Sequence, residues 1–251
     1  MNRFSFPFYR DSVDTLRWKT ARVQVESSDL YIRSTSDIYT YAEHACRSLR
    51  EIIRNHINIQ PDFLSTLTPL KRIHDVPDII SRMYSASEAA QVGPMASVAG
   101  AIAEFTGRIC KVHSEEIIIE NGGDIWLSIK EPVLISIYSG RSDFNNGIFL
   151  KILPEDTPMG LCTSSGTVGH SLSFGKANSV TILSRDASLA DAVATAAGNM
   201  VHTDDDIQRA VEYSLSVEGI TGAVIIKGNK LAAMGNVEFV DHTDNSIINN
   251  Y

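Results

Sequence analysis

Two oxygen-bearing side chains, Asp191 and Thr195, lie four positions apart in the segment LADAVATAAGN, residues 189–199. In a helix this spacing places them on one face, one turn apart. A carboxylate and a hydroxyl are ligands for a hard cation such as Mg²⁺, which also keeps water molecules and accepts oxygens from a bound phosphate. The same spacing also fits a solvated aspartate and a threonine bonded to its own backbone. The spacing alone leaves both interpretations open.

A polar segment with two glycines precedes this helix. Its residues are Thr163, Ser164, Ser165, Gly166, Thr167, Val168, Gly169 and His170. Hydroxyls packed this densely beside glycines are typical of a loop that faces a ligand or water, and loop N–H groups can bind phosphate without cationic side chains. His170 is the candidate catalytic residue because an imidazole, with a pKa near ~6.5, can transfer protons. An ordinary loop histidine is the alternative.

Glycines also mark two other segments. Asn121-Gly122-Gly123-Asp124 follows the apolar run 117–119 and predicts a tight hairpin turn, which on its own is weak support for a ligand site. A stripe of small residues at 4-3-4 spacing follows Gly93-Pro94 and consists of Ala96, Gly100, Ala103 and Gly107. Such a stripe lets another backbone or a flat ligand approach closely, and we favour tight packing against a sheet.

Composition restricts the class of protein. The chain has 251 residues, 43% of them hydrophobic, and a net charge of −8 without a basic run, which argues against a nucleic-acid partner. No apolar run approaches the ~20 residues that span a bilayer, and the first residues contain no apolar signal segment. Cys46, Cys110 and Cys162 are too widely spaced for a disulfide framework or a zinc site. The expected location is a reducing cytoplasm.

Helices and strands alternate irregularly along the chain. We expect strands at 22–26, 30–32, 117–119, 125–129, 133–138, 180–183, 221–227 and 230–240, with the three from 117 to 138 as a meander. We expect helices at 38–56, from Pro77, from Pro94, at 187–199 and from Thr203, where Asp206 reaches back to cap the helix, and a connecting loop at 58–75.

Four segments carry a resemblance to a known family. They are VGPMASVAGAIAE at 92–104, ENGGDIW at 120–126, CTSSGTVGHSLSFGKAN at 162–178 and LADAVATAAGN at 189–199. Over nearly the whole chain, the sequence resembles a UPF-type family of ApbE-like proteins. These are distant relatives of the magnesium-dependent FAD:protein FMN transferases.

The resemblance implies a fold and a ligand. The fold is α+β, of the ApbE-like (T-fold) type, with a mostly antiparallel sheet and helices packed on one face. We expect a single ApbE-like domain over 1–251, or two intertwined halves, with a loose tail at 241–251. Asp191 and Thr195 would hold Mg²⁺ with a main-chain oxygen near Val98, and FAD or a related flavin nucleotide would lie beside Thr163–His170. The turn at 121–124 would lie near the same cleft, and Gly100 matches the glycine of the family's helix-start motif.

Three departures separate this chain from the transferases. Ala99 stands at the position of the family's lysine, Glu104 replaces an aspartate, and 171–176 replaces a basic, proline-containing segment. The leading hypothesis is an ApbE-like protein that binds FAD with magnesium, with FMN transfer as a candidate activity. A non-catalytic module for a flavin or an anionic metabolite is one alternative, and a thiol-dependent accessory factor in sulfur metabolism that uses Cys162 is another. The expected partner is a small-molecule nucleotide, with neither nucleic acid nor membrane, and a homodimer is left open.

Overall fold

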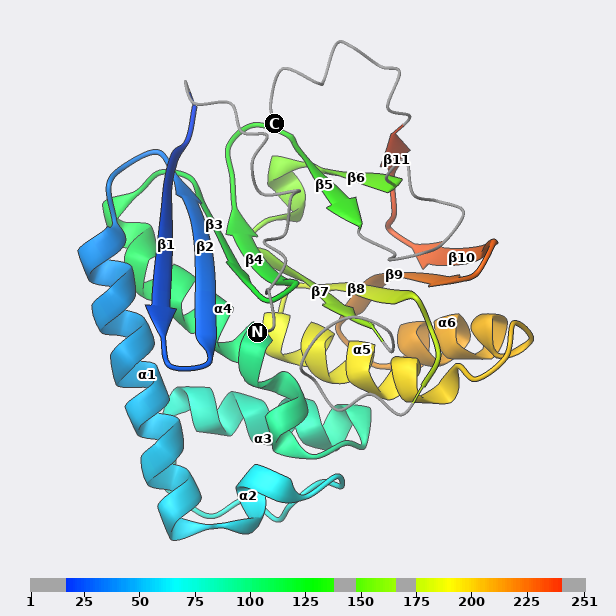
Figure 1. Cartoon of the computed structure of the whole chain (residues 1–251), viewed down its shortest axis with the longest axis horizontal. Coiled ribbons are helices and arrows are strands. Elements are labelled where there is room, and N and C mark those ends of the chain that lie inside the picture. The colour runs from blue at the N-terminus through cyan, green and yellow to red at the C-terminus, as the bar shows by residue number, and fades with distance from the viewer. Residues whose placement is uncertain (1–16, 138–147, 166–174, 241–251) are drawn as a thin grey trace, which may run out of the picture.

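The computed structural model describes residues 17–137, 148–165 and 175–240. A large antiparallel sheet forms the centre of the molecule, with strand order β1-β2-β3-β4-β7-β8-β9-β10. Helices cover one face of this sheet, and a small sheet of order β11-β6-β5 lies over the other face (Figure 1). The α+β prediction of a mostly antiparallel sheet with helices on one face is therefore confirmed.

The strands of the large sheet are β1 Lys19–Val25, β2 Ser28–Ser34, β3 Ile117–Asn121, β4 Asp124–Ser128, β7 Met159–Ser164, β8 Ser179–Ser184, β9 Ile220–Lys227 and β10 Lys230–Gly235. The small sheet contains β5 Val133–Ile137, β6 Ile148–Ile152 and β11 Phe239–Val240. The α-helices are α1 Tyr39–Ile59, α2 Asp62–Ser65, α3 Asp78–Ala90, α4 Val98–Cys110, α5 Ala187–Met200 and α6 Asp206–Ser216. Short 3-10 turns cover Pro94–Ser97, Lys111–His113 and Pro154–Asp156.

Burial patterns reflect this layering. In β2, alternate residues such as Leu30 and Ile32 are fully buried under the helices, as expected for a strand with one covered face. Every residue of β8 is buried, because α5 lies on one side of it and the small sheet on the other. One apolar cluster therefore lies between helices and large sheet, and a second lies between the two sheets.

Three predictions about strands and loops are wrong. β5 does not continue a meander after β4, because β7 pairs with the free edge of β4 and β5 joins the small sheet. The segment 58–75 is not wholly a loop: it contains α2, whose Phe63 packs fully buried against the rings of His56 and Tyr84. Thr163 and Ser164 belong to the end of β7 and not to a loop.

Several other local predictions are confirmed. The two glycines of the turn at 121–124 have φ values of 68° and 113°, which a hairpin turn between β3 and β4 requires. Asp206 reaches back as predicted, and its Oδ2 accepts the Thr203 N–H at 2.8 Å. The prediction that Thr203 caps the helix is wrong, because α6 begins at Asp206 and the residue at its N-cap is Asp205. Within the described ranges, no helix is both long and apolar enough to cross a membrane.

Candidate functional site

The turn between β3 and β4 places Asp124 at the centre of the large sheet. Asp124 lies opposite Cys162 of β7 in the antiparallel register, and its Oδ1 accepts the Thr163 N–H at 3.3 Å. On the other side of the turn, the Asn121 amide donates to the Ala99 carbonyl at 3.1 Å, at the start of α4. The hairpin is therefore tied both to β7 and to the helix layer.

Asp191 reaches the same region from α5. Its Oδ2 accepts the Gly100 N–H at 2.9 Å. A Cβ atom on Gly100 would lie 2.3 Å from the Ala187 carbonyl oxygen, so only glycine lets α4 and α5 approach this closely. Gly100 is thus explained by tight packing of two helices and by the hydrogen bond that its backbone gives to Asp191. The residue is also one of the predicted cofactor-binding positions, and that role remains a prediction.

The two carboxylates are both buried. Asp124 is 8% and Asp191 9% exposed. Burial raises the pKa of Asp124 to about 7, and the neighbouring Cys162 side chain and the Thr163 N–H only partly oppose this. Burial, and then the charge of Asp124, raise the pKa of Asp191 well above its ordinary value, while the N–H groups of Gly100 and Ala99 lower it. Among the described residues, neither carboxylate forms an ion pair with a basic side chain.

A divalent cation fits this set of donors. The charge of Asp124 raises the pKa of Asp191, so the two carboxylates bring negative charge into a buried place. Thr195, one turn after Asp191 on α5, is half-buried and carries a hydroxyl, and its role as a ligand remains a prediction. In the part of the chain that the structure describes, no three His, Cys, Asp or Glu side chains form a metal cage. A magnesium ion here would therefore complete its shell with water or ligand oxygens, as it commonly does.

Most of the polar segment after β7 lies outside the described residues, including Gly166, Thr167 and His170. The structure describes its first three residues, Thr163, Ser164 and Ser165. The Thr163 hydroxyl bonds to that of Thr181 at 2.9 Å, and the Ser165 hydroxyl donates to the Asn178 carbonyl at 2.8 Å. These two hydroxyls therefore hold the base of the segment to β8, and Ser164 is buried at the end of β7.

The environment of Cys162 argues against a thiolate nucleophile. The side chain is fully buried, and its Sγ donates to the Ala187 carbonyl at 3.3 Å. Burial and the neighbouring charges of Asp124 and Asp191 raise the pKa of this thiol well above its ordinary value. A reactive cysteine needs the opposite environment, electropositive and accessible. The hypothesis of a thiol-dependent factor therefore loses its physical basis.

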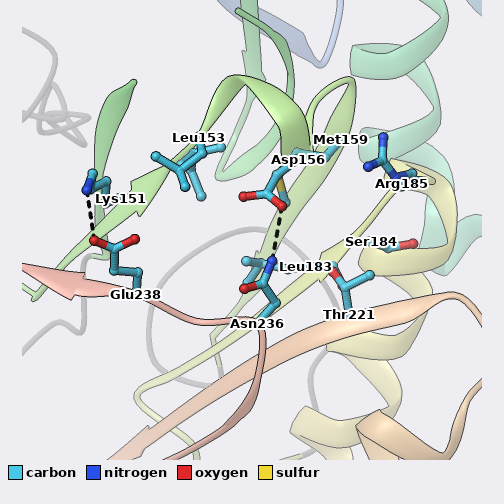
Figure 2. Close-up of a pocket in the computed structure, with 11 residues that line it drawn as sticks. Lys151, Leu153, Asp156, Met159, Leu183, Ser184, Arg185, Thr221, Asn236 and Glu238 are labelled. Atoms are coloured by element: carbon cyan, nitrogen blue, oxygen red, sulfur yellow. Dashed lines mark hydrogen bonds and ion pairs between the residues drawn. The ribbon is translucent and has the colours of Figure 1, made fainter. Parts of the chain in front are cut away.

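A separate pocket lies against the small sheet and contains none of the predicted site residues (Figure 2). It has a volume of about 70 Å³. Two pairs of its polar side chains bond to each other: Lys151 with Glu238 at 2.9 Å, and Asn236 with Asp156 at 3.1 Å. Arg185, which also lines the pocket, donates to the Glu155 carbonyl at 3.0 Å, so these charged groups already have hydrogen-bond partners.

Comparison with known proteins places the chain in a family. The family model described as "AbpE bacteria" matches residues 12–230. The chain belongs to this family. A UPF0280 protein from Methanococcus aeolicus is 36% identical over 233 residues, covering 90% of this chain and 94% of the relative. The family member MJ1526 from Methanocaldococcus jannaschii is 34% identical over 236 residues, covering 92% and 96%.

Solved structures show the same fold as this family member. A mutant of the flavin transferase ApbE from Vibrio cholerae matches with a TM-score of 0.57 at 11% identity, covering 87% of this chain and 97% of that one. The ApbE protein from Thermotoga maritima matches with a TM-score of 0.57 at 15% identity, covering 86% and 96%. At sequence identities this low, the structural similarity establishes that the chain has the ApbE fold.

Sequence patterns alone missed the groups that orient the two carboxylates. These groups are the backbone N–H of Gly100 and Thr163. The patterns also missed the contact of Glu104, which accepts the Ala187 N–H at 2.8 Å at the start of α5. Backbone donors have no signature in residue types. Glu104 did carry a signal, because it is a carboxylate on the small-residue helix of a family motif. The structure buries this carboxylate completely.

Proposed function

We propose that this family member binds a flavin nucleotide, with FAD as the leading candidate, together with a magnesium ion at Asp191, Thr195 and the neighbouring Asp124. The observation that carries the proposal is the meeting of two buried carboxylates from separate elements at the base of the polar segment 163–170, with no basic side chain paired to either among the residues that the structure describes. The likeness to flavin transferases in fold makes a flavin nucleotide the leading ligand.

The chain's own groups have distinct tasks in this proposal. The Gly100 N–H orients the Asp191 carboxylate, and the Thr163 N–H orients that of Asp124. N–H groups of the polar segment bind the remaining phosphate oxygens, and His170 is the candidate for proton transfer. A bound magnesium ion would neutralise charge on the nucleotide's phosphates.

A second candidate is a binding module without catalysis. It is favoured by Ala99, whose methyl side chain stands where the family resemblance places a lysine, and whose carbonyl accepts the Asn121 amide. Without a cationic side chain at that position, ligand phosphates have one positive partner fewer than in the transferases. Binding would persist under this candidate, and transfer would be lost.

The test is flavin retention by the purified full-length protein. After gel filtration with FAD, the flavin absorption band should remain with the protein when magnesium is present and decrease with a chelator. Asp191→Asn should lower magnesium-dependent affinity about a hundredfold, since it removes a charged ligand from the ion. Asp186→Asn is the matched control on the same helix, because asparagine caps a helix as well as aspartate does.

Two outcomes decide between the candidates. Release of AMP from FAD in the presence of an acceptor protein supports transfer, whereas retained flavin without AMP supports the binding module. If Asp191→Asn binds FAD as tightly as the unchanged protein with magnesium present, the proposed ion site is wrong.

A further inference from the structure

Glu104 is a completely buried carboxylate in α4 that the proposed site does not use. It accepts the Ala187 N–H at 2.8 Å and also the Ser188 N–H, the first two of α5, and it forms an ion pair with Arg108. A carboxylate is costly to bury unless such partners compensate it. The first N–H groups of a helix lack partners within the helix, so Glu104 supplies to α5 acceptors from a neighbouring helix.

The start of α5 is held at Ala187 from three sides. The Ala187 N–H donates to Glu104, and its carbonyl accepts the Cys162 thiol at 3.3 Å. Gly160 of β7 lies under Ala187, since a Cβ atom there would lie 2.3 Å from the Ala187 Cα. Helix α5 can therefore neither slide along α4 nor lift from β7 without losing these contacts.

Two hydrogen bonds between α4 and α5 lie one turn apart on each helix. On α4 they involve Gly100 and Glu104, and on α5 they involve Asp191 and Ala187. A shift of α5 by a fraction of a turn would separate Asp191 Oδ2 from the Gly100 N–H. The contact at Glu104 thus sets the helix position on which the contact at Asp191 depends.

We infer that Glu104 is a positioning residue for Asp191, because it holds α5 in the register at which the Asp191 carboxylate meets Gly100 and faces the cation site. The consequence for cation affinity rests on the proposed function, but the consequence for the Gly100–Asp191 hydrogen bond does not. Residues that orient metal ligands typically change metal affinity about 10–100-fold when replaced.

The experiment compares Glu104→Gln with a matched control, Glu116→Gln, in the full-length protein. Glu116 is also buried, 6% exposed, accepts the Lys130 N–H at 2.7 Å and pairs with Arg17, but its partners do not include α5. Glutamine keeps one acceptor oxygen at either position and turns the other into a donor. Both variants therefore lose a comparable buried interaction, and only one of them alters the start of α5.

Two measurements are made on each variant. Titration with Mn²⁺, followed by electron paramagnetic resonance of the free ion, gives cation affinity. Hydrogen exchange of the Gly100 N–H, followed by NMR without any cation, reports its bond to Asp191. We expect Glu104→Gln to weaken Mn²⁺ binding about tenfold and to speed Gly100 exchange, with Glu104→Asp restoring part of both. Glu116→Gln should change neither.

Unchanged Gly100 exchange in Glu104→Gln, or an equal change in Glu116→Gln, would overturn the inference. If the unchanged protein binds no Mn²⁺, the proposed cation site fails, and Gly100 exchange alone then decides the role of Glu104. If Glu104→Gln does not fold, the same exchange measurement on Glu104→Asp decides it. The shorter side chain keeps the carboxylate but draws it back from α5, so unchanged exchange there also contradicts the inference.

Discussion

Two buried acidic regions of this protein have opposite electrostatics. Just before β3, Glu116 pairs with Arg17 at 2.5 Å and accepts the N–H groups of Lys130 and Glu131, and these partners outweigh burial and lower its pKa. Where the β3–β4 turn meets α5, Asp124 and Asp191 have backbone N–H donors but no basic side chain among the described residues, and burial raises both pKa values. The carboxylate of the first region already has a positive partner. The carboxylates of the second region need a proton or an added cation to balance their charge.

This difference separates a structural acid from a candidate binding site. A carboxylate that is buried with its own arginine contributes to the fold and gains nothing from an added ion. Two carboxylates that are buried together without such a partner keep protons that a cation can replace. Variants that change one of the two regions at a time test this contrast.

Removing Arg17 should leave the buried Glu116 carboxylate without its positive partner. Arg17→Ala leaves Glu116 buried without its cation, and we expect the free energy of unfolding to fall by about 3 kcal/mol. Urea denaturation measures the loss. Arg22→Ala, which breaks the exposed pair with Asp29, should cost much less. Equal losses in the two variants would show that the pairing of Glu116 is not what stabilises this region.

Adding a methyl group at Gly100 should disturb the region of Asp124 and Asp191, because it changes how closely α4 and α5 pack. In Gly100→Ala the new Cβ would lie 2.3 Å from the Ala187 oxygen, and the overpacking should cost about 2 kcal/mol despite the better helix propensity of alanine. Cation affinity should fall as well, because α5 carries Asp191. Gly107→Ala on the same helix, whose Cβ would meet Trp126 at 2.1 Å, should lower stability alone. Calorimetry and Mn²⁺ titration separate the two effects.

The raised pKa of Asp124 predicts a pH dependence with a definite sign. Between the ordinary value of 3.8 and about 7, the folded carboxyl keeps its proton while the unfolded one has lost it. The folded state binds more protons in this window, so its stability without cations should fall as pH rises from about 4 to 7. Asp124→Asn should remove this contribution. Urea denaturation of both proteins at several pH values with a chelator measures the difference, and parallel curves would contradict it.

The smallest expected effect concerns the hydroxyl of Thr195. Thr195→Val keeps the shape of the side chain and removes one neutral oxygen, and we expect cation affinity to fall about fivefold, as for a single lost polar contact. Ser214→Ala is the control, since the Ser214 hydroxyl donates to the Ala210 carbonyl in its own helix at 2.7 Å. If Thr195→Val binds Mn²⁺ unchanged, the hydroxyl has only the local role that Ser214 has.

The sequence by itself determined the local elements of the site. Asn121-Gly122-Gly123-Asp124 predicts its hairpin because glycine adopts positive φ readily, and this turn is present. The segment 187–199 predicts its helix from composition and spacing, and α5 spans Ala187–Met200 with Asp186 as its cap. Such signals extend over a few residues, so they survive without knowledge of the rest of the chain.

Only the tertiary structure decided which of these elements meet. Asp124 and Asp191 come together because β4 pairs with β7 and because Gly100 and Gly160 let α5 lie close to α4 and to that strand. The same pairing sends β5 into the small sheet, contrary to the expected meander. Burial, and with it the raised pKa of both carboxylates, depends on atoms from elements far apart in sequence. No pattern of neighbouring residues contains those contacts, because desolvation and close packing arise only when the layers assemble.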